Sequence, residues 1–130
     1  MHGSLHHVEI YVSNLKKSTD FWKWLLVEKL QYTVFQQWPE GISFKLENTY
    51  LVFVQTEPSF LENQYHRKST GLNHLAFHGS SSIFINELTV ELKLRGIKIL
   101  YENKHPYAGG KDYYAVFFED PDKIKVEVVA

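Results

Sequence analysis

The chain has 130 residues, enough for one domain with a buried core and no disulfides. Its 14 Lys and Arg residues nearly balance its 15 Asp and Glu residues, so the sequence lacks the basic footprint of a nucleic-acid-binding protein. It has no cysteine, no secretory signal pattern and no apolar run of membrane-spanning length. We therefore expect a cytoplasmic protein that binds neither nucleic acid nor a membrane.

The first half of the chain predicts one strand, one helix and three further strands. Residues 5–12 alternate between polar and apolar side chains, as in a half-buried strand. Asn14 is a suitable N-cap, and the apolar spacing that follows predicts a helix over about 16–29. Strands are then expected at 31–35, 41–46 and 50–55.

The second half repeats this order after a polar linker at about 58–70. A strand is expected at 72–78, followed by a serine-capped helix that runs to about Arg95 and ends at Gly96. Further strands are expected at 97–101, 113–119 and 123–129, with a turn at 120–122. The chain is thus predicted to be a single domain, 1–130, of two modules at about 4–57 and 71–130.

The first strands of the two halves carry a histidine at the same place. His7 lies in LHHVEIYV at 5–12, and His74 lies in LNHLAFHG at 72–79. A duplicated fold can bring equivalent imidazoles to one point. Strand alternation places His7 on the face of Glu9 and His6 on the opposite face, so His7 is the favoured residue.

Three motifs occur in order along this duplicated pattern. They are HVEIYVSNL with Ser18, Phe21 and Trp22; GLNHLAF at 71–77; and FFEDPDKIKVE at 117–127. Together they resemble the vicinal oxygen chelate superfamily, which includes glyoxalase I, extradiol dioxygenases, and fosfomycin- and bleomycin-resistance proteins. The resemblance implies an α+β fold of two tandem strand-helix-strand-strand-strand modules that form a curved mixed sheet around a metal-binding cleft.

The resemblance also implies three metal ligands, His7, His74 and Glu127, with Glu127 essential for catalysis. Two neutral imidazoles and one carboxylate form a facial triad that leaves coordination positions open. A substrate can then bind through two adjacent oxygens, and the ion acts as a Lewis acid. The triad suits Fe(II), Zn, Mn, Ni or Co, and the sequence does not choose among them.

A fourth family position lies on the last strand of the first module and is often Glu in glyoxalases. Gln55 is the only polar candidate on the strand at 50–55. The sequence therefore leaves open whether Gln55 or water fills this position. Three-ligand members exist among the dioxygenases and the fosfomycin-resistance enzymes.

The expected function is that of a glyoxalase-like, metal-dependent enzyme of lyase or dioxygenase type, acting on a small substrate with vicinal oxygens. The alternative is a metal-free protein that sequesters a ligand, as bleomycin-resistance proteins do; the complete triad favours the enzyme. A fosfomycin transferase is disfavoured, because 111–116 lacks the expected Ser- and Arg-rich anion-binding residues. Exposed sheet edges and the resemblance predict a homodimer.

Three further features are open from the sequence. The glycine-containing loop at 105–110 either closes over a ligand or is an ordinary connection. Lys123 stands where the family usually has Gly, so a positive φ there would cost about 1 kcal/mol. Four aromatic residues are candidates for an apolar pocket or for the core: Trp38, Phe53, Tyr113 and Tyr114.

Overall fold

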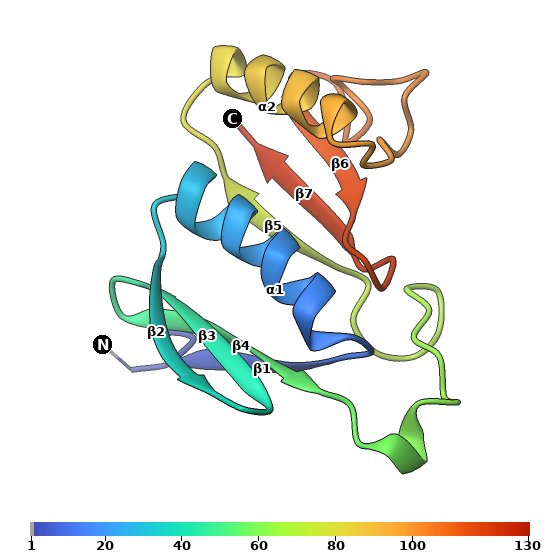
Figure 1. The fold of residues 1–130 in the computed structure, drawn as a ribbon. Coiled ribbons are helices and arrows are strands. Elements are labelled where there is room, and N and C mark those ends of the chain that lie inside the picture. The colour runs from blue at the N-terminus through green and yellow to red at the C-terminus, as the bar shows by residue number, and fades with distance from the viewer. Residues whose placement is uncertain (1) are drawn as a thin grey trace. The chain divides into compact units, whose positions relative to one another are not determined.

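The computed structural model describes residues 2–130 of the chain. It divides into two compact units, the first extending to Gln64 and the second running from Tyr65 to Ala130. Each unit combines a small sheet with a helix on one face, as Figure 1 shows. No helix of the described residues is long and apolar enough to cross a bilayer.

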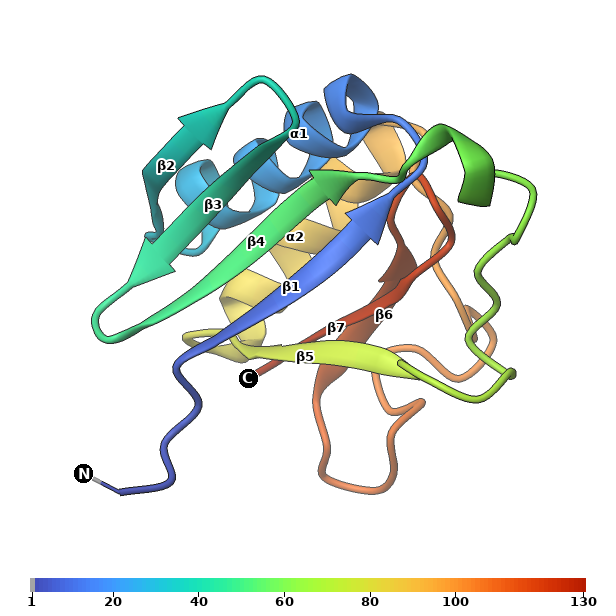
Figure 2. The ribbon, with the colours of Figure 1, turned by 90° about the horizontal axis from the view of Figure 1, so that it is seen from below.

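The first unit contains a four-stranded sheet. Its strands are β1 (His7–Val12), β2 (Thr33–Trp38), β3 (Gly41–Leu46) and β4 (Thr49–Gln55). They lie in the order β1-β4-β3-β2, which can be followed in Figure 2. β1 runs parallel to β4, and the other two pairs are antiparallel. A short 3-10 helix, η2 (Pro58–Phe60), follows the sheet.

The helix of this unit begins close to the residue that the sequence predicted. α1 (Leu15–Lys23) starts directly after Asn14, whose side chain accepts a hydrogen bond from a backbone N–H of the first turn. The chain continues as a π-helix, η1 (Trp24–Lys29), to the predicted end. The amphipathic face packs on the sheet, where the Trp22 and Phe53 rings stack with centroids 4.8 Å apart.

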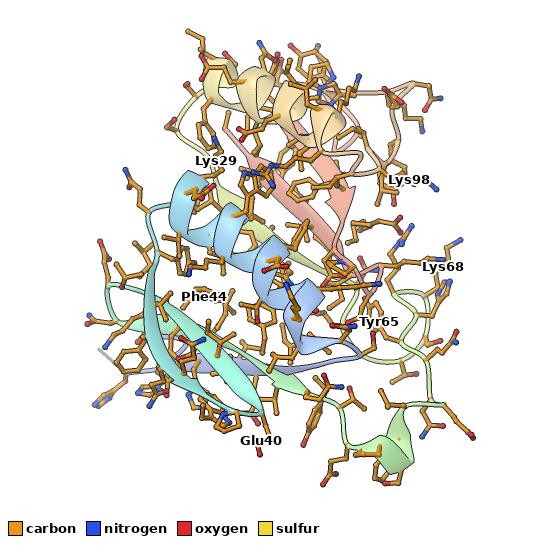
Figure 3. The ribbon with its side chains drawn as sticks, viewed as in Figure 1. Lys29, Glu40, Phe44, Tyr65, Lys68 and Lys98 are labelled. Carbon is orange, nitrogen blue, oxygen red and sulfur yellow. The ribbon has the colours of Figure 1, made fainter. Side chains whose placement is uncertain are left out.

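The core of the first unit lies between α1 and the sheet. Phe44 and Phe53 are both fully buried there, with ring centroids 6.1 Å apart. Figure 3 labels Phe44 on the side of the sheet that faces α1. Burial of such a side chain contributes roughly 1.5–3 kcal/mol. Because this face is committed to packing, the polar side chains His7, Glu9 and Tyr11 of β1 lie on the other face.

The second unit has a three-stranded sheet and one longer helix. Its elements are β5 (His74–His78), α2 (Ser82–Leu94), β6 (Ala115–Glu119) and β7 (Lys125–Val129). The strand order is β5-β7-β6, with β5 parallel and β6 antiparallel to β7. Ser81 caps α2 by accepting a hydrogen bond from Phe84 N at 3.2 Å. Val126 and Val128 are fully buried, and Val128 lies close to Phe84 and Ile85, so this face of β7 packs on α2.

The strand predicted at 97–101 is wrong. Only a single bridge, between Ile99 and Phe118, forms there, and Leu100 N donates one hydrogen bond to Phe117 O at 2.8 Å. The backbone of Tyr101 then has φ of 54°, which turns the chain away from the sheet. The second module therefore has one strand fewer than the predicted order.

The segment before β5 is fastened to the second unit by side chains. The Tyr65 hydroxyl, labelled in Figure 3, donates to Leu72 O at 2.7 Å, and burial raises the pKa of this phenol. Arg67 pairs with Glu119 on β6, with 2.6 Å between Nη1 and Oε2. The chain therefore enters β5, and so places His74, in a defined position.

Candidate metal centre

In each unit the predicted ligands lie on the sheet face opposite the helix. Phe53 lies on the α1 side of β4, so the alternation of β1 and β4 turns His7 and Tyr50 to the other face. In the second unit Val126 and Val128 are fully buried on the α2 side, so Glu127 faces away from α2. In each unit, the helix lies on the other side of the sheet from this face, as Figure 1 shows.

His74 and Glu127 are neighbours on β5 and β7. Ala76 is the direct partner of Glu127, so His74 lies one pleat away on the same face. The distance from His74 Nε2 to Glu127 Oε1 is 3.3 Å. Glu127 is only 3% exposed, so its carboxylate is held where bulk water cannot fully solvate it. The structure thus brings together two of the three predicted ligands.

Asn73 sets the tautomer of the His74 ring and therefore leaves the lone pair on Nε2, the nitrogen that faces Glu127. Asn73 Oδ1 lies 2.7 Å from His74 Nδ1. An amide oxygen only accepts hydrogen bonds, so Nδ1 carries the proton and Nε2 of the neutral ring carries a lone pair. Two electron-pair donors then face each other across 3.3 Å. That arrangement needs a proton or a cation between them.

The donor pair fits a divalent cation. Ligand atoms at the usual bond lengths of about 2.0–2.2 Å lie roughly 3.0–3.4 Å apart across one metal ion. The 3.3 Å between His74 Nε2 and Glu127 Oε1 agrees with that spacing. An imidazole with its other nitrogen held by a hydrogen bond, beside a buried carboxylate, is also the common chemistry of such sites.

Tyr113 forms a hydrogen bond with the second carboxylate oxygen of Glu127. Its hydroxyl donates a hydrogen bond to Glu127 Oε2, and this bond, reinforced by burial and by the negative charge, raises the pKa of the Tyr113 phenol. Gly109 makes room for the ring, because a Cβ at this position would lie 2.4 Å from Tyr113 Cδ1. The loop at 105–110 is therefore packed, at Gly109, against a residue of the site.

His7 in the first unit has a similar arrangement. Its ring stacks on Tyr50 with centroids 4.8 Å apart and an angle of 4° between the planes. His6 Nδ1 lies 2.8 Å from His7 Nδ1. The prediction that His6 lies on the opposite face is wrong, because β1 begins only at His7 and the alternation does not extend to His6. In both units the preceding residue thus contacts Nδ1 of the predicted ligand.

The strand register identifies the fourth position as Val52 rather than Gln55. In the second unit His74 pairs with Lys125, two residues before Glu127. In the first unit His7 pairs with Tyr50, two residues before Val52. Val52 is therefore the counterpart of Glu127. An aliphatic side chain provides no ligand atom at this position.

Gln55 has a structural role at the end of β4. Its Oε1 accepts a hydrogen bond from Leu15 N at 2.9 Å, and its Nε2 donates to Ser13 O at 2.9 Å. Both partners belong to the segment that starts α1. The amide is thus used to join β4 to the helix start, and its oxygen is already engaged.

The aromatic candidates for a pocket separate into different roles. Phe53 is fully buried in the core, so the core alternative holds for this residue. Tyr114 donates to Asn86 Oδ1 on α2 at 2.5 Å, whereas Tyr113 reaches Glu127. A shallow hollow of about 520 Å³ in the first unit is lined by Trp38 and by residues of α1, and its lining contains none of the predicted ligands.

No group of three or more His, Cys, Asp or Glu side chains within residues 2–130 forms a complete metal site. His74 and Glu127 supply two donors, and His7 belongs to the other unit. Sequence reasoning missed the contributions of Asn73 and Tyr113. The signal for Asn73 was its place directly before His74. Tyr113 had no local signal, because β6 and the turn after it separate Tyr113 from Glu127 in the sequence.

Comparison with known proteins gives a consistent result. The Glyoxalase/Bleomycin resistance protein/Dioxygenase superfamily matches residues 4–128. The chain is 52% identical over 126 residues to the uncharacterized Bacillus subtilis protein YqjT, covering 97% of this chain and 98% of the relative. A crystal structure from Bacillus halodurans, of a protein described provisionally as a glyoxalase, is 56% identical with a TM-score of 0.96, covering 99% and 96% of the two chains.

A more distant structure shares the fold alone. Lactoylglutathione lyase from Agrobacterium tumefaciens has a TM-score of 0.67 and 16% identity, covering 98% of this chain and 92% of that one. The likeness to the Bacillus halodurans structure confirms the predicted α+β fold with tandem modules. The chain therefore belongs to the Glyoxalase/Bleomycin resistance protein/Dioxygenase superfamily.

Proposed function

We propose that this protein is a glyoxalase-like enzyme of lyase or dioxygenase type that requires a divalent metal ion and acts on a small substrate with vicinal oxygens. The observation that carries the proposal is the pair of donor atoms His74 Nε2 and Glu127 Oε1, 3.3 Å apart on a sheet face free of its helix. Family membership supports the same reading.

His7, His74 and Glu127 are the proposed ligands. His7 is included because it is equivalent to His74 in the repeat and because the family resemblance implies it. With His7, the set consists of two imidazoles and one carboxylate. When bound, a divalent ion supplies Lewis-acid stabilisation of negative charge that develops on substrate oxygens. Iron, zinc, manganese, nickel and cobalt all suit this donor set.

The chain's own residues orient these donors. Asn73 holds the His74 ring with Nε2 turned toward the carboxylate, so the ring pays little rotational entropy when it binds an ion. Burial of Glu127 keeps competing water from its carboxylate. A substrate would meet a site whose protein donors are already in place.

The second candidate function is ligand sequestration without metal, as in bleomycin-resistance proteins. One observation favours it. The Tyr113 hydroxyl already satisfies Glu127 Oε2, and a protonated His74 would satisfy Oε1, so the network can be complete without an ion. In that case the site would be a polar floor for a bound molecule rather than a reaction centre.

Metal analysis separates the two functions. The protein is purified without chelators, and its metal content is measured by elemental mass spectrometry. The enzyme proposal predicts about one divalent ion per chain, removed by EDTA and restored by titration with Mn²⁺, Zn²⁺, Ni²⁺, Co²⁺ or Fe²⁺. Absence of metal, together with no binding of any of these ions at micromolar concentration, would overturn the enzyme proposal and favour the binding-protein alternative. The reconstituted protein is then screened with small α-oxygenated metabolites for turnover.

A further inference from the structure

We propose that Tyr113 is a positioning residue for Glu127: it holds one carboxylate oxygen so that the other is presented, together with His74, to a divalent metal ion. This inference rests on the proposed function and names a residue outside the predicted ligand set. Three independent contacts support it, and each belongs to the second unit.

The first contact fixes the carboxylate. Tyr113 donates to Glu127 Oε2, while Oε1 is the oxygen that lies 3.3 Å from His74 Nε2. A carboxylate with no such partner can rotate about its terminal bond and offer either oxygen or both. The hydroxyl therefore assigns one oxygen to the protein and the other to the ion.

The second contact places the ring of Tyr113. Gly109 lies against it so closely that an added Cβ would be 2.4 Å from Cδ1 and 2.8 Å from Cε1. A side chain at position 109 would therefore overlap the ring and force it to move. Glycine at this position is required by the close approach of the ring.

The third contact fixes the backbone of the same residue. Tyr113 N donates to Gly110 O at 3.2 Å, in the turn that precedes β6. Tyr113 remains 37% exposed although its hydroxyl reaches a carboxylate that is 3% exposed. The residue therefore lies at the edge of the site, with its hydroxyl directed inward.

The chemical consequence concerns open coordination positions. A carboxylate that binds through one oxygen takes one position on an ion, and one that binds through two takes two. Because Tyr113 holds Oε2 in a hydrogen bond, Glu127 binds the ion through Oε1 alone and an additional coordination position remains for the substrate. This matters for a substrate that binds through two adjacent oxygens, because it needs two positions at once.

The test uses cobalt binding to the full-length chain. Metal-free wild-type protein and the Tyr113→Phe variant are titrated with Co²⁺, and both affinity and the visible absorption of the bound ion are recorded. Loss of an orienting partner of a ligand typically weakens metal binding about 10- to 100-fold. We expect Tyr113→Phe to lose at least tenfold in Co²⁺ affinity and to change the visible spectrum. Tyr114→Phe is the matched control, because that hydroxyl contacts Asn86 on α2.

A second variant moves the ring without removing the hydroxyl. Gly109→Ala should displace Tyr113 and reproduce the loss in Co²⁺ affinity. In the Tyr113→Phe background the same substitution should cause no further loss, because the two changes act through one hydrogen bond. Circular dichroism of each variant establishes that the fold is retained.

The outcomes are distinct. Wild type that binds Co²⁺, with Tyr113→Phe equal to it in affinity and spectrum, would overturn the role of Tyr113 and leave the proposed function intact. Tighter binding by Tyr113→Phe would overturn it too, since the hydroxyl would then compete with the ion for Glu127. Wild type that binds no Co²⁺ would overturn the proposed function and this inference together.

Discussion

Val52 in the first unit occupies the position that Glu127 occupies in the second. Each lies two residues beyond the strand partner of the predicted histidine ligand, on the parallel neighbour of the first strand. The repeat is therefore conserved in backbone register but not in chemistry. Across from Val52 stands Glu9, whereas Ala76 stands across from Glu127, so the acidic residue lies on the other strand of the pair.

Replacing Val52 with Glu should create a fourth ligand. Val52 is only 4% exposed, so without metal the new carboxylate is buried and we expect a loss of roughly 2–4 kcal/mol in the free energy of unfolding. A divalent ion should recover most of that loss and raise the melting temperature by more than it does in wild type. Thermal denaturation with and without Mn²⁺ or Zn²⁺ measures both effects.

Gln55→Glu is the matched control for this prediction. Gln55 donates to Ser13 O and accepts from Leu15 N, and a Glu keeps only the acceptor. We expect a loss of about 1 kcal/mol in stability that does not depend on metal. A metal-dependent stabilisation by Gln55→Glu, and none by Val52→Glu, would mean that the register argument identifies the wrong residue.

Local patterns predicted the local structure well and long-range neighbours poorly. The caps at Asn14 and Ser81 and the left-handed residue Gly96 all occur, because caps are determined by residues a few positions apart. The alternation of a strand specifies its two faces but not its partner residues, so it could not select Val52 over Gln55. Only the paired strands of the structure supply that information.

The residues directly before the two predicted histidine ligands, His6 and Asn73, should be interchangeable in the way they orient the ring. Asn73 holds His74 Nδ1 at 2.7 Å, and His6 lies 2.8 Å from His7 Nδ1. If His6 orients His7 toward an ion, His6→Asn should keep metal affinity and His6→Ala should lower it about tenfold or more. Asn73→Ala should lower it similarly. Isothermal titration with Zn²⁺ provides the comparison, and equal affinity of His6→Ala and wild type would exclude the orienting role of His6.

A homodimer is predicted from the edge of the first sheet. β2 lies at that edge, and Val34 and Phe35 on it are both exposed. An exposed, apolar edge strand favours pairing with a second chain. Sedimentation at micromolar concentration should therefore show a dimer, and Val34→Lys should shift it toward monomer. Ile83→Lys on the exposed face of α2 is the control; only monomer in wild type would contradict the prediction.

Lys123 should be replaceable by Gly with a gain in stability. Its φ is 65°, in the left-handed region that costs a non-glycine residue about 1 kcal/mol or more. Lys123 N donates to Asp120 O at 2.9 Å within the turn, and that bond does not need the side chain. We expect Lys123→Gly to raise the free energy of unfolding by roughly 0.5–1 kcal/mol. Urea denaturation measures this, and a destabilised variant would show that the lysine side chain makes a compensating contact.

Glu127→Gln should remove metal binding and activity while preserving the fold. The substitution keeps the volume of the side chain, and neighbouring Val126 and Val128 still pack the core on the α2 side of β7. It replaces an anionic ligand oxygen with a neutral amide oxygen, so the ion binds more weakly and the stabilisation of developing negative charge is lost. We expect unchanged circular dichroism, a fall of about 100-fold or more in metal affinity, and loss of turnover on the substrate that the metabolite screen identifies.

The control for this last prediction lies on the same sheet face. Glu119 of β6 is engaged by Arg67 at 2.6 Å rather than by His74, so Glu119→Gln also removes one negative charge from the second unit. It should cost some stability but leave metal content unchanged. If both variants lose metal equally, the effect arises from net charge and not from coordination. Full metal content and full activity in Glu127→Gln would remove Glu127 from the site altogether.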